Sequence, residues 1–174
     1  MRLRIRDARP SDGKAIEAVT LAAYQQYAAL MPELWERYRQ NILATLAAAQ
    51  PDTQIVAEED GRIVGSVLLY PAGTVFARPG GGSAALASPE VRLLAVDPEA
   101  RGKGVGAALM QACVARARES GTSSLTLHTT EIMQAAMRLY ERMGFVRAPE
   151  LDFEPAPGVA VKGYRLDLKD KASR

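Results

Sequence analysis

The alternation of apolar and polar positions predicts strands near both ends of the chain and in its middle. Leu3–Arg6 alternates apolar and charged residues with a period of two, as a strand with one buried face does. Two β-rich runs flank Asp60–Gly61, a dipeptide that supplies the positive φ of a tight hairpin turn. The other predicted strands are 90–96, 123–129, a short segment at Phe145, and 161–168.

Apolar residues that recur three and four positions apart predict four helices. The first covers about residues 12–30. The second begins near Pro32, which suits a first helical turn. The third follows a glycine-rich turn and runs to about Ser120, and the fourth covers 131–142, with Gly144 as its C-cap.

The order of these elements predicts a mixed α/β fold in a single domain. From residue 90 on, strand, helix, strand and helix follow one another, which implies a right-handed crossover and parallel pairing of 90–96 with 123–129. A chain of 174 residues is most simply one domain, so we predict one domain over 1–168 and a frayed tail over 169–174. Residues 71–89 are rich in Gly, Pro and Ser, which indicates a long mobile loop that is either functional or disordered.

Composition and charge exclude several classes of protein. The chain carries 22 Lys and Arg against 20 Asp and Glu, scattered along its length, so no basic face for nucleic acid is expected. Its one His and its one Cys, Cys113, exclude a Cys/His zinc cluster and an internal disulfide. The N-terminus lacks the apolar run of a signal peptide, and no window approaches the roughly 18 apolar residues of a membrane span. We therefore expect a cytoplasmic protein without a metal or a membrane anchor.

The sequence RGKGVG at residues 101–106 places three glycines and two cations immediately before the third predicted helix. A helix N-terminus has four N–H groups without partners and carries about half a positive charge, so it favours an anion. Glycines let an anion approach the backbone closely. We interpret the segment as a phosphate-binding loop. The simpler alternative, a flexible turn, requires only one or two glycines.

Two other phosphate-binding motifs fit this segment less well. A P-loop requires Ser or Thr after its lysine, and here Gly104 follows Lys103. A dinucleotide fingerprint is matched by Gly102, Gly104 and Ala107, but it normally follows the first strand and precedes an acidic residue about 20 positions on. The next predicted strand here ends in His128-Thr129-Thr130, without a carboxylate. A nicotinamide-dependent enzyme is therefore a distant alternative.

A third pattern, Arg-x-x-Gly-x-Gly at Arg101, Gly104 and Gly106, resembles the acetyl-CoA pyrophosphate loop of the GNAT superfamily of N-acyltransferases. Its surroundings, EVRLLAVDPEARGKGVG, resemble that family's central strand, turn and helix, and AMRLYERMGF resembles its later helix-and-strand motif. The order of predicted elements over 1–168 is also the family's order. The resemblance implies a mixed, largely antiparallel central sheet with a splayed parallel pair of central strands, flanked by helices.

The resemblance also implies an activity, the transfer of an acetyl group from acetyl-CoA to a primary amine by direct attack in a ternary complex. The amine would belong to a small molecule, an amino acid or a protein amino terminus. The pyrophosphate would bind main-chain groups of the loop, namely Arg101, Gly102, Lys103, Gly104, Val105 and Gly106. The pantetheine arm would pair with main-chain groups of the central strand at Leu94, Ala95 and Val96, one of which would also polarise the thioester carbonyl.

The resemblance further implies candidates for the proton transfers. Tyr140 stands where the family's tyrosine protonates the leaving thiolate, since tyrosine hydroxyls and thiols have similar pKa values. Glu90 stands where some members carry a catalytic glutamate. Even spacing puts four residues on one face of the strand unless a bulge intervenes, namely Glu90, Arg92, Leu94 and Val96. The alternative for Glu90 is a solvated carboxylate or a partner of Arg92, and His128 is the rival base.

Two further expectations concern the ligands. Many family members have Asn seven residues before the tyrosine, where this chain has Met133 with Gln134 beside it, so the local contact to acetyl-CoA is lost or replaced. The acceptor is expected between the first two helices and the 71–89 loop, near aromatic and basic residues that core packing explains equally well. These residues are Tyr24, Tyr27, Trp35, Arg37, Tyr38 and Arg39.

A second class of function stays open. A catalytically silent acyl-CoA-binding or sensor domain would keep the RGKGVG loop and would require neither Glu90 nor Tyr140. The presence of Tyr140 favours the enzyme. Dimers are common in the family, so the resemblance allows a homodimer.

Overall fold

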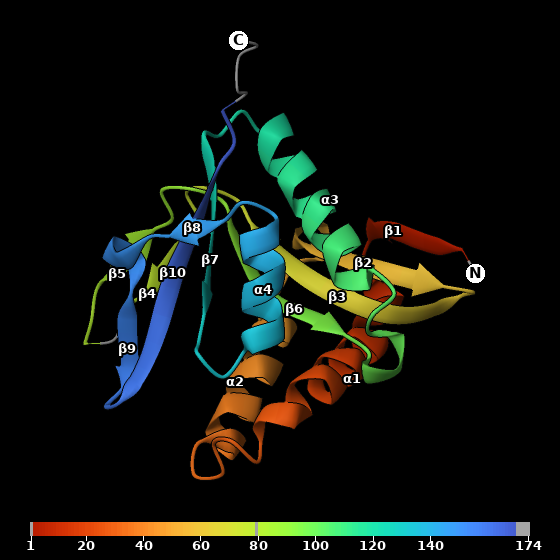
Figure 1. Cartoon of the computed structure of the whole chain (residues 1–174), viewed down its shortest axis with the longest axis horizontal. Coiled ribbons are helices and arrows are strands. Elements are labelled where there is room, and N and C mark those ends of the chain that lie inside the picture. The colour runs from red at the N-terminus through yellow and green to blue at the C-terminus, as the bar shows by residue number, and fades with distance from the viewer. Residues whose placement is uncertain (1, 79, 170–174) are drawn as a thin grey trace. The chain divides into compact units, whose positions relative to one another are not determined.

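The computed structural model describes residues 2–78 and 80–169 (Figure 1). Contacts between residues divide the chain into two compact units. Unit 1 contains Leu93–Ala112 and the residues up to Leu69, and unit 2 contains Tyr70–Arg92 and the residues from Cys113 on. Strand β6 (Glu90–Val96) and helix α3 (Val105–Glu119) each contribute residues to both units. The single domain over 1–168 stays a prediction.

Unit 1 is built on an antiparallel set of strands. Strands β1 and β3 both pair antiparallel with β2, and β6 follows β3 in the strand order. Asp60 and Gly61, with φ of 49° and 83°, form the predicted hairpin turn. Besides its parts of β6 and α3, the elements of unit 1 are β1 (Leu3–Asp7), α1 (Gly13–Tyr24), α2 (Trp35–Ala48), β2 (Gln54–Glu59) and β3 (Arg62–Tyr70) up to Leu69.

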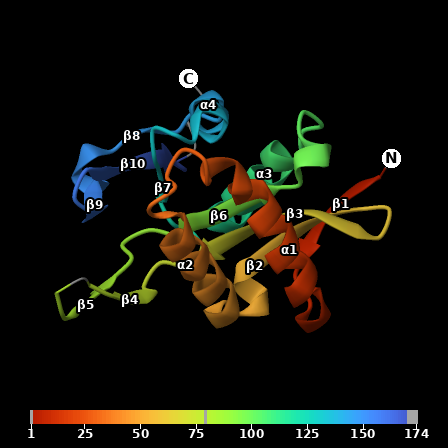
Figure 2. The same cartoon turned by 90° about the horizontal axis from the view of Figure 1, so that it is seen from below.

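Helices α1 and α2 pack on one face of these strands (Figure 2). Ile16 and Val19 of α1 are buried against Val56 of β2 and Ile63 of β3. Leu46 of α2 packs on the same cluster. Burying an Ile or Val side chain contributes roughly 1.5–3 kcal/mol, so the three-residue spacing on α1 determines which side of this helix meets the strands.

A bulge in β3 turns Gly65 toward helix α3. The register of the β2–β3 pair shifts by one residue at Val64, and a bulge of this kind redirects the side chains that follow. A Cβ on Gly65 would lie 2.9 Å from Cγ1 of Val105 and 3.0 Å from Cδ1 of Leu109. The missing side chain therefore lets the first turns of α3 lie directly against β3, which fixes the place where α3 begins.

Unit 2 combines one parallel and several antiparallel pairs. The N-terminal part of β6 pairs parallel with β7, β7 pairs antiparallel with β10, and β8 and β9 both pair with β10. Besides its parts of β6 and α3, its elements are β4 (Val75–Ala77), β5 (Ser83–Ala85), β7 (Ser124–Thr129), α4 (Gln134–Arg142), β8 (Val146–Arg147), β9 (Phe153–Ala156) and β10 (Val159–Asp167). The prediction of a mixed α/β fold with a mostly antiparallel sheet, one parallel pair and flanking helices is confirmed.

The predicted end of the first helix and the predicted start of the second helix need correction. Helix α1 ends at Tyr24 and not near residue 30, because the 3-10 turn Gln25–Tyr27 follows it. Side chains of Gln26 and Arg101 bind the Ala23 carbonyl at this end, and the contact from Arg101 is a tertiary one that no local pattern reveals. Helix α2 begins at Trp35, several residues after Pro32.

Predictions in the second half of the chain also need correction. Helix α4 begins at Gln134 and not at 131, because the N–H of Met133 closes a turn onto the Thr130 carbonyl at 3.0 Å. The 71–89 segment is not a featureless loop, since β4 and β5 form a hairpin within it. The short strand is β8, just after Phe145, and β9 was not predicted because its four residues include a proline and no clear alternation.

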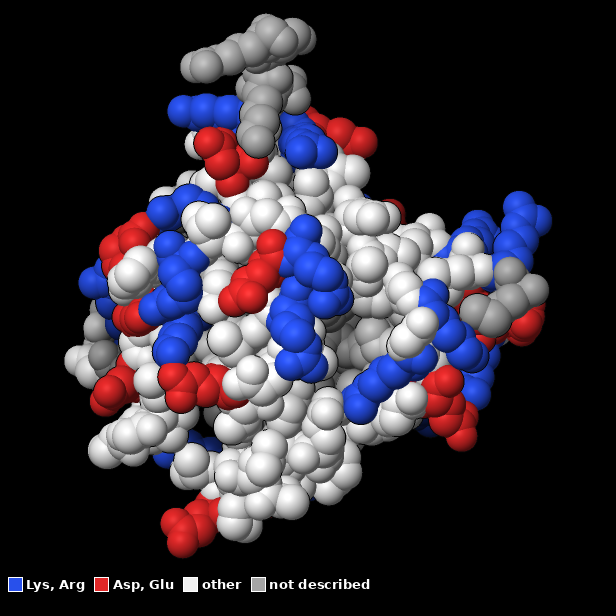
Figure 3. All heavy atoms as spheres, viewed as in Figure 1, with Lys and Arg blue, Asp and Glu red and all other residues white. Residues whose placement is uncertain are grey.

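Charged side chains of both signs are interspersed on the face drawn in Figure 3. This agrees with the scattered charges of the sequence. Within the part of the chain that the structure describes, no helix has the length and apolar character needed to cross a membrane. The predicted tail falls mainly on residues 170–174, which lie outside the described residues.

Candidate active site

The turn after β6 is anchored to β3. The N–H of Asp97 donates to the Val64 carbonyl at 2.9 Å, and the Asp97 carboxylate forms an ion pair with Arg62. The same carboxylate accepts from the N–H of Glu99 at 2.9 Å, which starts a short 3-10 turn over Pro98–Ala100. These contacts hold the segment that leads into the glycine-rich loop.

The glycine-rich loop exposes main-chain donors at the start of α3. Gly102 and Gly104 have φ of 75° and 80°, in the left-handed region that favours glycine, and a Cβ on either would meet nothing within 4 Å. The first bond into the helix runs from the N–H of Ala108 to the Gly104 carbonyl, at 3.0 Å. Residues 101–104 are all exposed. The geometry is that of an open anion-binding turn.

The side chain of Arg101 points away from this turn, to the end of α1. Its Nη2 donates to the Ala23 carbonyl at 3.1 Å, and its Nη1 donates to Oε1 of Gln26 at 3.5 Å. Nε2 of Gln26 donates to the same Ala23 carbonyl at 2.8 Å. A cation is favourable at a helix C-terminus, so the guanidinium stabilises the end of α1. Arg101 and Lys103 are both exposed.

A left-handed residue interrupts strand β6. Leu93 has φ of 51°, which is unusual for a residue with a branched side chain and breaks the alternation of faces. Glu90 and Arg92 do share a face, because Nε of Arg92 donates to Oε1 of Glu90 at 2.7 Å. The single face predicted from Glu90 through Val96 is therefore interrupted at Leu93.

Glu90 is a buried carboxylate between two basic side chains. It is 4% exposed, and its Oε1 lies 2.7 Å from Nε of Arg92 and 3.5 Å from Nδ1 of His128. Burial raises the pKa of Glu90, but the hydrogen bond from His128 and the charge of Arg92 outweigh it, so that the pKa lies below its ordinary value. Glu90 is thus ionised at neutral pH. Its pairing with Arg92 is one of the two alternatives that the sequence left open.

His128 is placed between two hydrogen-bond acceptors. Its Nδ1 faces Glu90, and its Nε2 lies 2.9 Å from the Leu151 carbonyl, so both nitrogens can donate only in the imidazolium form. Burial lowers the pKa of His128, but Glu90 and the Leu151 carbonyl together raise it above its ordinary value. Both ring nitrogens of His128 therefore face groups of the protein itself.

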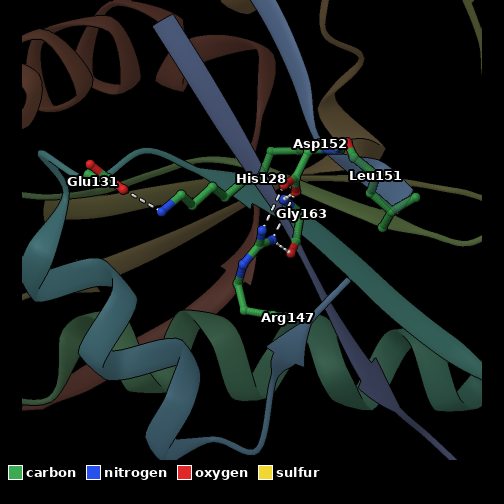
Figure 4. A network of polar contacts seen from close by, with 7 residues as sticks. His128, Glu131, Arg147, Leu151, Asp152 and Gly163 are labelled. Carbon is green, nitrogen blue, oxygen red and sulfur yellow. Dashed lines mark hydrogen bonds and ion pairs between the residues drawn. The ribbon is translucent and has the colours of Figure 1, made fainter. Parts of the chain in front are cut away.

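A polar network holds the segment that contacts His128 (Figure 4). Arg147 binds Asp152 through both terminal nitrogens, at 2.9 Å and 2.7 Å. Oδ1 of Asp152 accepts from the N–H of Gly163 at 2.8 Å, which ties the segment to β10. A Cβ on Gly163 would lie 2.3 Å from Cβ of Leu151, so the glycine allows Leu151 to approach β10.

Tyr140 is part of the packed interior of unit 2. It lies on α4, is 6% exposed, and its ring centroid lies 6.0 Å from that of Phe145. Met133 precedes α4, and its carbonyl accepts the first helical hydrogen bond, from the N–H of Met137 at 3.0 Å. The structure therefore places Met133 at the helix start.

The aromatic residues expected near the acceptor form a cluster in unit 1. The ring of Tyr24 lies 5.7 Å from that of Tyr27 and 6.0 Å from that of Tyr38, and Trp35 lies 6.2 Å from Tyr38. Burial raises the pKa of Tyr38 and of Tyr27, with the Arg101 charge opposing the shift at Tyr27. Tyr24 is buried at 8% exposure, so packing between α1 and α2 accounts for much of this cluster.

A second aromatic group, in unit 2, was missed by the sequence analysis. The Arg92 guanidinium carbon lies 4.0 Å from the ring centroid of Phe76 and 5.3 Å from that of Tyr70. The Phe76 ring meets the Tyr70 ring edge-on at 5.2 Å. The Thr-Val-Phe run within the 71–89 segment favours a strand, and it was the signal in the sequence that could have indicated this group.

Known proteins are similar to this chain in sequence. Residues 20–145 match the acetyltransferase (GNAT) family. A mycothiol acetyltransferase of Thermobispora bispora is 47% identical over 58 residues, which cover 33% of this chain and 20% of that protein. N-acetyltransferase 8B of Homo sapiens is 33% identical over 102 residues, which cover 56% of this chain and 40% of that protein. The aligned part of this chain thus spans less than half the length of either relative.

Solved structures show the same fold. A GNAT family acetyltransferase from Brucella melitensis in complex with acetyl-CoA has a TM-score of 0.62 at 24% identity, covering 95% of this chain and 88% of that one. A GNAT acetyltransferase from Staphylococcus aureus has a TM-score of 0.71 at 16% identity, covering 97% and 100%. Because the family match spans more than half of the sequence and includes both the glycine-rich loop and Tyr140, the chain belongs to the acetyltransferase (GNAT) family.

Proposed function

We propose that this chain is an acetyl-CoA-dependent N-acetyltransferase that acetylates a primary amine by direct attack in a ternary complex. The observation that carries the proposal is the open turn at the start of α3, where Gly102 and Gly104 leave main-chain donors accessible. The Brucella melitensis neighbour was solved with acetyl-CoA, and the relatives are named as acetyltransferases, which supports the same ligand class here.

The donors of this turn fit a diphosphate. Main-chain N–H groups, the positive end of α3 and the exposed Lys103 all favour an anion, and the glycines put no side chain in its way. We assign the pyrophosphate to the main chain of residues 101–106 and the pantetheine arm to the main chain of Leu94, Ala95 and Val96. Strand β6 pairs with β7 at Glu90 and Val91, ahead of these three residues, which supports their use by a ligand.

The proposed transfer forms a bond between the amine nitrogen and the acetyl carbon and breaks the bond from that carbon to sulfur. Acetyl-CoA supplies the acetyl group in the activated form of a thioester. Glu90 accepts the proton that the nitrogen loses, and Tyr140 donates the proton that the sulfur gains. The low pKa of Glu90 makes it a weak base, so it suits a nitrogen that becomes acidic as the new bond forms.

Two measurements test this proposal together. Calorimetric titration with acetyl-CoA tests binding, and release of free thiol over a panel of primary amines tests transfer. We expect both saturable binding and amine-dependent thiol release. Binding without thiol release from any amine would instead identify an acyl-CoA-binding domain, and the absence of binding would overturn the assignment of the loop. A homodimer and a cytoplasmic location stay predictions from the sequence.

A further inference from the structure

Arg92 is held in place on three sides within unit 2. Its Nε donates to the buried Glu90 carboxylate at 2.7 Å. Its guanidinium carbon lies 4.0 Å from the Phe76 ring centroid and 5.3 Å from that of Tyr70. Arginine stacks on aromatic faces and gains cation–π attraction there, so both contacts restrict its rotation. An arginine side chain fixed in this way has little conformational entropy left to lose when it binds a ligand.

The edge of this guanidinium that carries the two terminal nitrogens is accessible to a ligand. Among the described residues, neither terminal nitrogen of Arg92 has a hydrogen-bond partner, and the side chain is 36% exposed. Two parallel N–H groups on a planar fork match the two oxygens of a carboxylate. Arg147 and Arg165, which also belong to unit 2, instead direct a terminal nitrogen to a carboxylate of the protein itself.

Arg92 shares its carboxylate partner with a second basic side chain. Arg92 and His128 both lie beside the Glu90 carboxylate, so the charge of Glu90 does not serve Arg92 alone. The Leu151 carbonyl lies 2.9 Å from Nε2 of His128, and Asp152 ties the segment of Leu151 to β10 (Figure 4). Uncompensated charge in a partly buried site is costly, so an anionic group on a ligand would be favoured beside the open edge of Arg92.

From this arrangement we infer that Arg92 binds a carboxylate of the acceptor, and that the acceptor is an α-amino acid. The inference rests on the proposed acetyltransfer and deepens it. The amino and carboxyl groups of an α-amino acid are separated by a single carbon, as suits a site where a carboxylate, Glu90, adjoins the guanidinium of Arg92. The rings of Tyr70 and Phe76 offer apolar surface beside the same guanidinium.

Paired ligands test this inference directly. Calorimetric titrations in the presence of CoA compare phenylalanine, leucine and aspartate with their α-amides, which keep the amine and the side chain but lack the α-carboxylate. We expect the free acid to bind about 10- to 100-fold more tightly than its amide in at least one pair. Equal binding within every pair, or no binding of any free acid, would overturn the inference.

Two substitutions assign the preference to Arg92. Arg92→Met should abolish the difference between acid and amide and leave the affinity for acetyl-CoA unchanged. Arg165→Met is the matched control, because Arg165 is similarly exposed at 39% and pairs with one carboxylate, Glu150. Among the residues that the structure describes, its guanidinium does not stack on an aromatic ring. A preference that survives Arg92→Met, or that disappears equally in Arg165→Met, would contradict the assignment.

A conservative variant and a parallel assay complete the design. Should Arg92→Met fail to fold, Arg92→Lys keeps the charge beside Glu90 but loses the planar fork, and it should still reduce the preference about tenfold. Thiol release is measured on the same ligands. A carboxylate preference in binding without thiol release would overturn the acetyltransfer alone, whereas thiol release without such a preference would overturn only the role of Arg92.

Discussion

Gly104 offers the sharpest test of the proposed diphosphate site. Its φ of 80° favours glycine, and a Cβ there would meet nothing within 4 Å. Any side chain at this position therefore costs about 1–2 kcal/mol of backbone strain without a packing clash. Gly158, in the turn between β9 and β10, has φ of 78° and equally open surroundings, so it provides a matched control.

The expected loss of affinity follows from charge. Two unit charges about 4 Å apart interact by ~1 kcal/mol at the dielectric constant of water, so a glutamate beside the two charges of a diphosphate costs ~2 kcal/mol. That energy corresponds to an approximately 30-fold increase in Kd. Gly104→Gln has nearly the same shape without the charge, so the difference between Gly104→Glu and Gly104→Gln isolates the electrostatic part.

Calorimetric titration with CoA at two salt concentrations measures this difference. Gly104→Glu should bind about 30-fold more weakly than Gly104→Gln at low salt, and the gap should narrow near 1 M salt, where the Debye length falls to about 3 Å. Gly158→Glu should bind like the wild type while losing a similar amount of thermal stability. Equal CoA affinity of Gly104→Glu and Gly158→Glu would refute the reasoning about this loop.

Three other substitutions probe the interior of the protein. Tyr140→Phe should lower kcat about 10²- to 10⁴-fold with little change in the Kd of acetyl-CoA, because it removes a proton donor and little volume; unchanged kcat, with chemistry shown to limit the rate, would exclude Tyr140 as the acid. Gly65→Ala should lower the free energy of unfolding by about 1–3 kcal/mol, since its Cβ would lie 2.9 Å from Cγ1 of Val105, whereas Gly13→Ala has open space; equal stability of the two variants in urea would contradict the close approach of α3. The raised pKa of His128 means that its protonated form stabilises the fold fully below its ordinary value of 6.5, and that this contribution is lost as pH rises through the folded-state pKa. His128→Gln should therefore cost more stability at about pH 5.5 than at about pH 9, and an equal cost at both would show that His128 is not held as a cation.

Much of the fold was predictable because local sequence determines it. The Asp60–Gly61 turn, the three-residue spacing on α1 and the strand–helix–strand order after residue 90 each encode a structure within a few residues. The structure has a hairpin, a helix and a parallel pair at these places. Contacts between distant residues explain the errors. Helix α1 ends early where Arg101 reaches Ala23, and that contact joins residues 78 positions apart.

The candidate site was predictable as separate residues but not as an arrangement. Glu90 and His128 were both named from the sequence, yet their contact depends on the register of the parallel pair, in which Glu90 lies opposite Thr126, two residues before His128. The left-handed φ of Leu93 has no signature in the sequence, because leucine rarely adopts it. The contact of Arg92 with Phe76 could not be predicted, because Phe76 lies on β4, within a segment whose composition indicated only a loop.

The direction of the Arg101 side chain changes what the motif Arg-x-x-Gly-x-Gly can report. The arginine fastens the end of α1, whereas the glycines serve the main chain that faces a ligand. The arginine of the motif therefore has a structural role, whereas its glycines have a role in ligand binding. A related protein that no longer binds the ligand would still need the arginine to stabilise α1, but it could replace the glycines. The glycines are therefore the residues of this motif that indicate whether ligand binding is retained.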